Sequence, residues 1–361
     1  MNKPQNGGVL LTTDKTSYRP LFETKSQRKN ALLSFILVSL LIMLISCKGE
    51  NKQSVKLTGD TEIDALSAAI GKNPDDANLY FQRARKFYDK GSYDMTINDM
   101  MKAMTIDSLN PDFYHLLSDA YLDYMNSNGA LNAMNKVLSI YPERIPSLLK
   151  MAELKYILED YDGSILTLNE IIRLDQNNAE AYFMLGNNFR ALSDSERAKN
   201  AYQTAVEMDS KLTDAWISLG ELYEEKKDPK ALTYYESAIL SDPASMQALH
   251  AKAYYLQNHG KINEAKEIYR QIILTDRTYT DAYLNSGLLY MEQDSFDRAY
   301  EQFDLMASVS PTNYQGFYYR GIVNNLMGNK EKAILDLESA LRLNPKDKKT
   351  EEALNTLKTS K

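Results

Sequence analysis

Large and small apolar residues alternate with polar stretches along most of this chain in a pattern that repeats every 34 residues. Aligning the chain with itself shows successive units from Ala77 to Asp347, of which the fifth is one residue short. Such a period predicts stacked supersecondary units that bury a continuous core between neighbours. The units begin at Ala77, Pro111, Ile145, Ala179, Thr213, Met246, Thr280 and Tyr314.

Two places in every unit hold a small residue. The eighth place is Ala84, Ser118, Ala152, Gly186, Gly220, Ala253, Gly287 or Gly321. The twentieth, counted one less in the short unit, is Thr96, Ala130, Ser164, Ala198, Ala231, Ala265, Ala299 or Ala333. Two helices approach closely only where neither carries a bulky side chain. The pattern therefore predicts two closely packed antiparallel helices in each unit.

Large side chains occupy other fixed places of the unit and are expected to fill the space between helix pairs. Each aromatic residue can bury roughly 150–250 Å². The fourth place is Tyr80, Tyr114, Leu148, Tyr182, Trp216, Leu249, Tyr283 or Phe317. Near the ends of four units a proline, which cannot continue a helix, separates one pair from the next.

This pattern resembles the tetratricopeptide repeat (TPR) over about three quarters of the chain. The fifth unit reads TDAWISLGELYEEKKDPKALTYYESAILSDP from Thr213. The resemblance implies an all-α fold, an α-solenoid of about eight helix-turn-helix repeats, and a role in holding other proteins. Six residues depart from the usual large apolar type and are expected to weaken individual repeats: Arg83, Lys155, Lys252, Ser286, Arg320 and Asn324.

The ends of the repeat array resemble the caps that a solenoid needs. Residues 60–361 are predicted to form the solenoid. A half-repeat from Thr61 to Lys72 precedes the first unit, and a charged helix over residues 348–361 follows the last. Polar terminal caps keep stacked arrays soluble.

The amino-terminal part of the chain has a different character. Arg28 and Lys29 precede an uncharged, mostly apolar run over residues 31–46. This run is short for a membrane span, which needs about 20 residues, and suits a secretory signal. It ends in Leu-Ile-Ser before Cys47, which resembles a bacterial lipoprotein signal with Cys47 as the lipidated residue. An uncleaved signal anchor is the alternative interpretation.

The resemblance divides this region into a leader and signal over residues 1–46 and a polar tether over residues 47–59. Lys48 follows the lipidation site where an aspartate would imply inner-membrane retention, so the resemblance favours the outer membrane. The solenoid is then expected outside the cytoplasm. Residues 1–27 exceed a usual signal peptide, and represent an over-extended translation start or a disordered leader.

Composition narrows the classes of function. The formal net charge is −7 and no basic stripe is present, which argues against nucleic acid as a partner. One cysteine and three histidines leave little material for a metal centre. None of the common phosphate-binding, nucleophile or metalloprotease motifs occurs. We therefore expect no catalytic residues, no cofactor and no metal, and a protein that is not an enzyme.

By the resemblance, the first helix of each pair lines a concave groove through its second, fifth, ninth and twelfth places. The predicted groove residues are mainly apolar, aromatic and acidic: Phe81, Arg85, His115, Asp119, Glu153, Phe183, Asn187, Ile217, Glu221, His250, Tyr254, Leu284 and Tyr318. The lysine and asparagine of a chaperone-type carboxylate clamp do not occur together. A partner segment with apolar anchors and some positive charge fits better. Alternatively, the acids only solvate this face and the apolar residues pack locally.

Two functional hypotheses from different classes remain beside the unlikely enzyme. The first is a lipid-anchored protein-interaction scaffold of the bacterial cell envelope. The second is an accessory lipoprotein that binds a glycan or peptidoglycan fragment, since aromatic rows can stack on sugars. Exposure of Tyr88, Tyr156, Tyr254 and Tyr318 distinguishes the two.

Overall fold

The computed structural model describes residues 58–359, which form eighteen helices and no strand. The chain divides into two compact units, residues 1–68 and 69–361. Of the first unit the structure describes residues 58–68, which include the start of α2 (Thr61–Lys72). The predicted signal segment and Cys47 lie outside the described residues.

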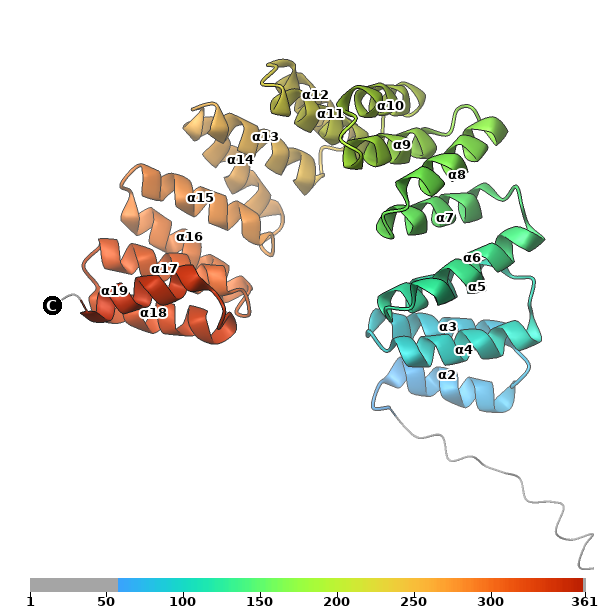
Figure 1. Cartoon of the computed structure of the whole chain (residues 1–361). Helices are drawn as coiled ribbons and strands as arrows, with labels where there is room; N and C mark the ends of the chain where they lie inside the picture. The colour runs from blue at the N-terminus through green and yellow to red at the C-terminus, as the bar shows by residue number, and fades with distance from the viewer. Residues whose placement is uncertain (1–57, 360–361) are drawn as a thin grey trace, which may run out of the picture. The chain divides into compact units, whose positions relative to one another are not determined.

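The second unit is a succession of paired helices that follow one another along the chain (Figure 1). The first helices begin where the sequence units begin: α3 (Ala77–Asp89), α5 (Pro111–Asp123), α7 (Ile145–Ile157), α9 (Ala179–Ala191), α11 (Thr213–Glu225), α13 (Met246–Asn258), α15 (Thr280–Glu292) and α17 (Tyr314–Leu326). The second helices are α4 (Tyr93–Ile106), α6 (Ser127–Ile140), α8 (Tyr161–Leu174), α10 (Ser195–Met208), α12 (Lys230–Ser241), α14 (Ile262–Thr275), α16 (Phe296–Val309) and α18 (Lys330–Leu343). The final helix is α19 (Lys348–Thr359). The α-solenoid predicted from the sequence is confirmed.

Close packing within each pair depends on the small residues. All sixteen are buried. In three repeats a glycine of the first helix lies against an aromatic ring of the second: Gly186 faces Tyr202, Gly220 faces Tyr235, and Gly287 faces Phe303. In the first three repeats a hydroxyl at one small place donates to the carbonyl at the other, as Ser164 Oγ does to Ala152 at 2.8 Å.

The turn between the two helices of a pair has the same backbone conformation in all eight repeats. The residue at the fifteenth place of the repeat lies in this turn and has a positive φ. It is glycine in three repeats: Gly91, Gly260 and Gly328. The other five are Met125, Glu159, Ser193, Lys227 and Asp294, with φ between 53° and 60°. The next residue donates its N–H back to the eleventh place, which closes the turn. Five turns therefore hold a side chain where glycine would relieve backbone strain.

Glu159→Gly is expected to stabilise the protein by about 0.5–1 kcal/mol. Relief of left-handed strain is worth about 1–2 kcal/mol, and the greater freedom of glycine in the unfolded chain offsets part of it. The gain should appear as a higher urea midpoint. Gly328→Ala is the matched control: no atom lies within 4 Å of the added methyl group. It should lower the midpoint through the backbone alone, and an unchanged midpoint for both variants would contradict the argument.

Aspartates organise the junctions between repeats. At five junctions the residue directly after a second helix is an aspartate whose Oδ1 accepts a backbone N–H two residues on, as Asp209 does from Lys211 at 2.9 Å. Such Asx turns reverse the chain through a bond from backbone to side chain, and only after Asp242 is the next residue a proline, Pro243. Proline was predicted to separate the pairs at the ends of four units, and this role of aspartate was not predicted.

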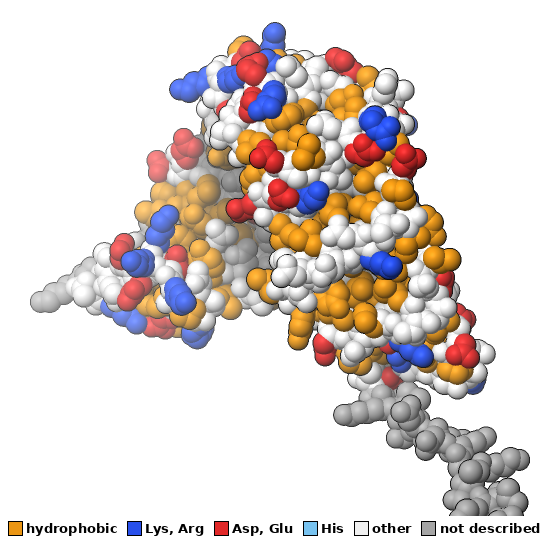
Figure 2. Space-filling model, turned by 45° about the vertical axis from the view of Figure 1, so that its right-hand side comes forward, with side chains coloured by type: hydrophobic (Ala, Val, Ile, Leu, Met, Phe, Trp, Pro, Cys, Tyr) orange, Lys and Arg blue, Asp and Glu red, His pale blue; other side chains and the backbone are white. Residues whose placement is uncertain are grey.

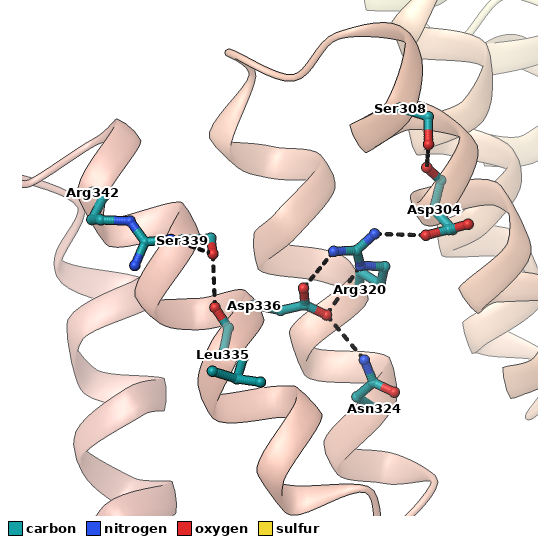
Figure 3. Close-up of polar contacts among 8 residues, drawn as sticks. All are labelled: Asp304, Ser308, Arg320, Asn324, Leu335, Asp336, Ser339 and Arg342. Carbon is teal, nitrogen blue, oxygen red and sulfur yellow. Dashed lines mark hydrogen bonds and ion pairs between the residues drawn. The ribbon is translucent and has the colours of Figure 1, made fainter.

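Three of the basic residues that replace an apolar one are held by acids of the second helices. Arg83 bonds Asp99 at 2.6 Å, and Lys252 bonds Glu236 at 2.9 Å. Arg320 contacts Asp336 and, in the preceding repeat, Asp304, while Asn324 donates to Asp336 at 3.0 Å (Figure 3). Polar contacts thus take the place of apolar packing at these positions.

Candidate functional site

The first helices of neighbouring repeats contact one another directly, for example α7 with α9 and α11 with α13. Their side chains therefore form one surface, which we call the first-helix face. Figure 2 shows one face of the molecule, on which hydrophobic patches lie between scattered charges. Two large cavities open on the first-helix face, and they include eight of the thirteen predicted groove residues.

The α7–α9 cavity has a volume of about 640 Å³. Three successive first helices line it, and its wall combines apolar and aromatic side chains with an equal number of polar ones: His115, Pro146, Leu149, Lys150, Glu153, Tyr156, Ile157, Glu180, Phe183, Met184, Asn187 and Asn188. Tyr156 is 36% exposed at this wall. This mixture is typical of a site for an apolar anchor with polar flanks.

The α11–α13 cavity has a volume of about 690 Å³. Its aromatic part is made by Tyr254, His250 and Tyr279. The rings of His250 and Tyr254 are nearly parallel, at an angle of 13° and a centroid distance of 6.4 Å. Tyr254 is 46% exposed, so its ring is accessible to a ligand. The remaining lining residues include Arg190, Asp214, Ile217, Ser218, Glu221, Glu224, Glu225, Tyr235, Gln247 and Ala251.

Ion pairs between neighbouring repeats neutralise part of the acidity that the sequence predicted for this face. Lys150 Nζ lies 2.7 Å from Asp119 and 3.0 Å from Glu153. Arg190 contacts Glu221 and lies 2.7 Å from Glu225. Each cation thus joins two carboxylates, so part of the negative charge predicted for this face is compensated within the chain.

Burial and pairing shift the pKa values of these groups. Burial raises the pKa of Asp119, although Lys150 opposes the shift. Burial lowers the pKa of Lys150, but its hydrogen bonds to Asp119 and Glu153 outweigh burial and give a net rise. Arg190 behaves similarly, since Glu221 and Glu225 raise its pKa above the ordinary value despite burial. Both cations therefore remain charged at neutral pH.

The two histidines of the first-helix face are neutral structural residues. Nε2 of His115 lies 2.9 Å from Oγ of Ser147, and Nε2 of His250 lies 2.9 Å from Nδ2 of Asn285. Burial, together with the positive charge of Arg144, lowers the pKa of His115. Burial also lowers the pKa of His250. The two residues line different cavities.

The remaining predicted groove residues are placed differently. Asp119 lines a smaller cavity of about 210 Å³ between α5 and α7. Arg85 lies over the ring of Phe81, which contacts Phe113. Leu284 and Tyr318 are partly buried and pack against apolar clusters of the last repeats.

One set of cavity residues was not predicted from the sequence. Side chains at the sixth place of the repeat also line the two cavities: Lys150, Met184, Ser218 and Ala251. The sixth place lies one residue from the fifth on the same helix, and its varied chemistry gave no periodic signal. Asn188, at the tenth place, was also missed, although this place is apolar in six other repeats.

Within residues 58–359 no group of three or more His, Cys, Asp or Glu side chains is arranged to hold a metal ion. In the same part of the chain, no helix has both the length and the apolar character needed to cross a membrane.

Comparison with known proteins gives matches to repeat proteins. Residues 183–248 and 247–279 match family models of the tetratricopeptide repeat. The chain is 24% identical over 327 residues to the DnaJ protein P58IPK homolog of Arabidopsis thaliana, covering 84% of this chain and 62% of that protein. It is 22% identical to the Hsp70-Hsp90 organizing protein of Triticum aestivum, covering 71% and 39%. The chain thus spans less than two thirds of either curated relative.

The crystal structure of the APC/C hetero-tetramer Cut9-Hcn1 contains a chain with a similar fold. The TM-score is 0.50 at 16% sequence identity, and the match covers 82% of this chain and 58% of that one. At this identity the likeness concerns the fold alone. Together with the family matches and the eight helix pairs, it shows that this chain contains tetratricopeptide repeats arranged as an α-solenoid.

Proposed function

We propose that this chain is a non-catalytic, lipid-anchored scaffold of the bacterial cell envelope that binds partner proteins along its first-helix face. The observation that carries the proposal is the presence of two sizeable cavities on this face, each combining exposed aromatic and apolar side chains with charged ones. TPR proteins typically mediate protein–protein interaction, which supports this choice. The histidines of the face are held in structural hydrogen bonds, so a binding role fits better than catalysis.

The anchoring part of the proposal rests on the sequence. Cys47 is the single cysteine of the chain and directly follows the apolar run over residues 31–46. Lipid chains on Cys47 contribute about 0.8 kcal/mol per buried methylene, and more than one chain gives lasting attachment. The tether over residues 47–59 then connects the lipid to the solenoid. Lys48 favours the outer membrane, with the solenoid outside the cytoplasm.

The charges of the first-helix face favour a partner segment with apolar anchors and a moderate positive charge. Arg190 and Lys150 compensate Glu221, Glu225, Asp119 and Glu153 only in part, since each cation faces two acids. Asp214, Glu180 and Glu224 add further negative charge to the two cavities. A basic segment therefore complements this face better than an acidic one.

Site-specific photocrosslinking in cells tests the proposal. A photoreactive phenylalanine analogue at Tyr254 should yield one recurring crosslinked protein. The same analogue at Leu240 is the matched control, because Leu240 is 83% exposed on the neighbouring second helix α12 and lines neither cavity. In a Cys47→Ala background the chain should leave the membrane fraction, and the crosslink should weaken.

Equal crosslinking at Tyr254 and Leu240 would contradict partner binding at the first-helix face. A Cys47→Ala chain that stays in the membrane fraction at its uncleaved length would show a signal anchor instead. Self-crosslinks alone would favour the second candidate, binding of a glycan or peptidoglycan fragment. The exposed rings of Tyr156 and Tyr254 favour that candidate, whereas Tyr88 and Tyr318 are partly buried.

A further inference from the structure

The amide of Asn188 leaves one hydrogen-bonding group unsatisfied in the wall of the α7–α9 cavity. Asn188 is fully buried, and its Nδ2 donates to the carbonyl of Met184 at 2.8 Å. This bond fixes the amide orientation, because the reverse orientation would place two oxygens together. Among the described residues no donor reaches its Oδ1, and no other buried side-chain nitrogen or oxygen lacks a partner.

The position of Asn188 in the repeat makes this orphan acceptor unusual. The same tenth place holds buried apolar residues in six other repeats, including Leu154, Leu222 and Leu289. A buried acceptor without a donor destabilises a protein, whereas an apolar side chain of similar size does not. Repeat four therefore carries a polar group at a place where the fold itself accepts leucine.

We propose that the α7–α9 cavity binds a tryptophan side chain of a basic partner segment, whose indole N–H donates to Oδ1 of Asn188. Indole suits the site because it has one donor and no acceptor, and its large apolar surface matches Leu149, Ile157 and Phe183 in the wall. A lysine or arginine would instead bury a charge against a single neutral acceptor.

Entry of the ring requires movement of the side chains that close Oδ1 from solvent. Met184 lies in this wall, and methionine changes its conformation at little cost because its side chain is unbranched. Tyr156 lies in the same wall and is exposed, so its ring is accessible to the entering indole.

The net charge around the cavity determines which residues next to the tryptophan in the partner segment are favourable. Glu153 and Glu180 line the cavity together with one cation, Lys150, which is also shared with Asp119. The balance is negative, so basic residues beside the tryptophan complement it. This inference rests on the proposed binding of proteins at the first-helix face and names the side chain that the face recognises.

The test is a titration of the full chain with a short peptide that has a central tryptophan between two lysines. The matched peptide carries 1-methyltryptophan, which has the same ring without the N–H. We expect the tryptophan peptide to bind about tenfold more tightly, the factor typical of one hydrogen bond to a desolvated neutral acceptor. Methyl resonances of Met184 and Ile157 should shift, whereas that of Ile217 in the α11–α13 cavity should not.

Asn188→Leu supplies the decisive variant, because leucine occupies the same place in three other repeats and should preserve the fold. The preference for tryptophan over 1-methyltryptophan should disappear in this variant. Replacing both lysines of the peptide by glutamates should weaken binding to the wild-type chain.

Equal affinity of the two peptides for the wild-type chain, shifts at Ile217 instead of Met184, or absence of binding would each overturn the inference. If any of these results is obtained but the analogue at Tyr254 still crosslinks a partner protein, the proposed function remains supported. If the peptides behave as expected but Tyr254 gives no crosslink, the proposed scaffold function fails and the indole site stands.

Discussion

Gly220→Leu is expected to destabilise the fifth helix pair by about 3 kcal/mol, at the upper end of the usual effect of overpacking. A Cβ atom added at Gly220 would already lie 2.6 Å from Cδ1 of Tyr235, well inside van der Waals contact. Tyr235 is only 2% exposed, and its hydroxyl donates to Glu224 at 2.7 Å. Moving the ring aside would break this hydrogen bond and push the buried ring out of its packed position, so we expect α11 and α12 to separate.

The measurement is amide hydrogen exchange followed along the chain. Since each repeat contacts only its neighbours, protection should fall first in α11 and α12 and should persist in α3 and α4. Unchanged exchange in α11 and α12 would show that the contact between Gly220 and Tyr235 does not determine their packing.

A double substitution provides the matched control. Repeat three packs Ala152 where repeat five has Gly220, and Leu168 where it has Tyr235. Gly220→Ala combined with Tyr235→Leu copies that combination into repeat five. It should restore most of the protection that Gly220→Leu removes, because the added methyl group then meets a smaller side chain. Failure of the double variant to fold would contradict the view that these two places pack as a pair.

The period of the sequence was sufficient to predict the fold, because it repeats the same steric requirement eight times. Small residues such as Ala84 and Ala333 recur at fixed places, and only close helix pairs require them there. The positive φ of Glu159 or Lys227 was not predictable in this way. Backbone geometry imposes that conformation on whichever residue stands fifteenth, so its identity varies and carries no signal.

The candidate site was harder to predict because its charges meet only in the stacked array. Arg190 and Glu221 are 31 residues apart, as are Asp119 and Lys150. This separation is shorter than the 34-residue repeat by three residues, which is about one helical turn. The two residues of each pair therefore lie on neighbouring first helices, offset along the helix axis by about one turn. The repeat pattern assigned Asp119, Glu153 and Glu221 to the face one by one. It could not identify their partners without knowing how adjacent helices are offset.

Arg320→Met is expected to destabilise the last two repeats by about 3 kcal/mol, because it leaves Asp336 as an uncompensated buried charge. The guanidinium bonds Asp336 through Nη2 at 2.5 Å and Nε at 3.0 Å, and Asp304 through Nη1 at 2.6 Å (Figure 3). Asp336 is 8% exposed, whereas the side chain of Asp304 is 46% exposed and can be hydrated. Chemical denaturation monitored by hydrogen exchange in α17 and α18 measures the loss.

The double variant Arg320→Leu with Asp336→Leu removes both the ion pair and the unpaired charge. It therefore separates the stability that the contacts of Arg320 contribute from the penalty of leaving Asp336 without a cation. Leucine occupies the place of Arg320 in three other repeats, and Leu337 and Leu354 already form the neighbouring core. Replacement of a buried ion pair by apolar residues is often neutral or stabilising. The double variant should therefore recover most of the stability that Arg320→Met loses. If it is instead as unstable as the single variant, the contacts of Arg320 contribute directly to the packing of the last repeats, and apolar side chains cannot replace them.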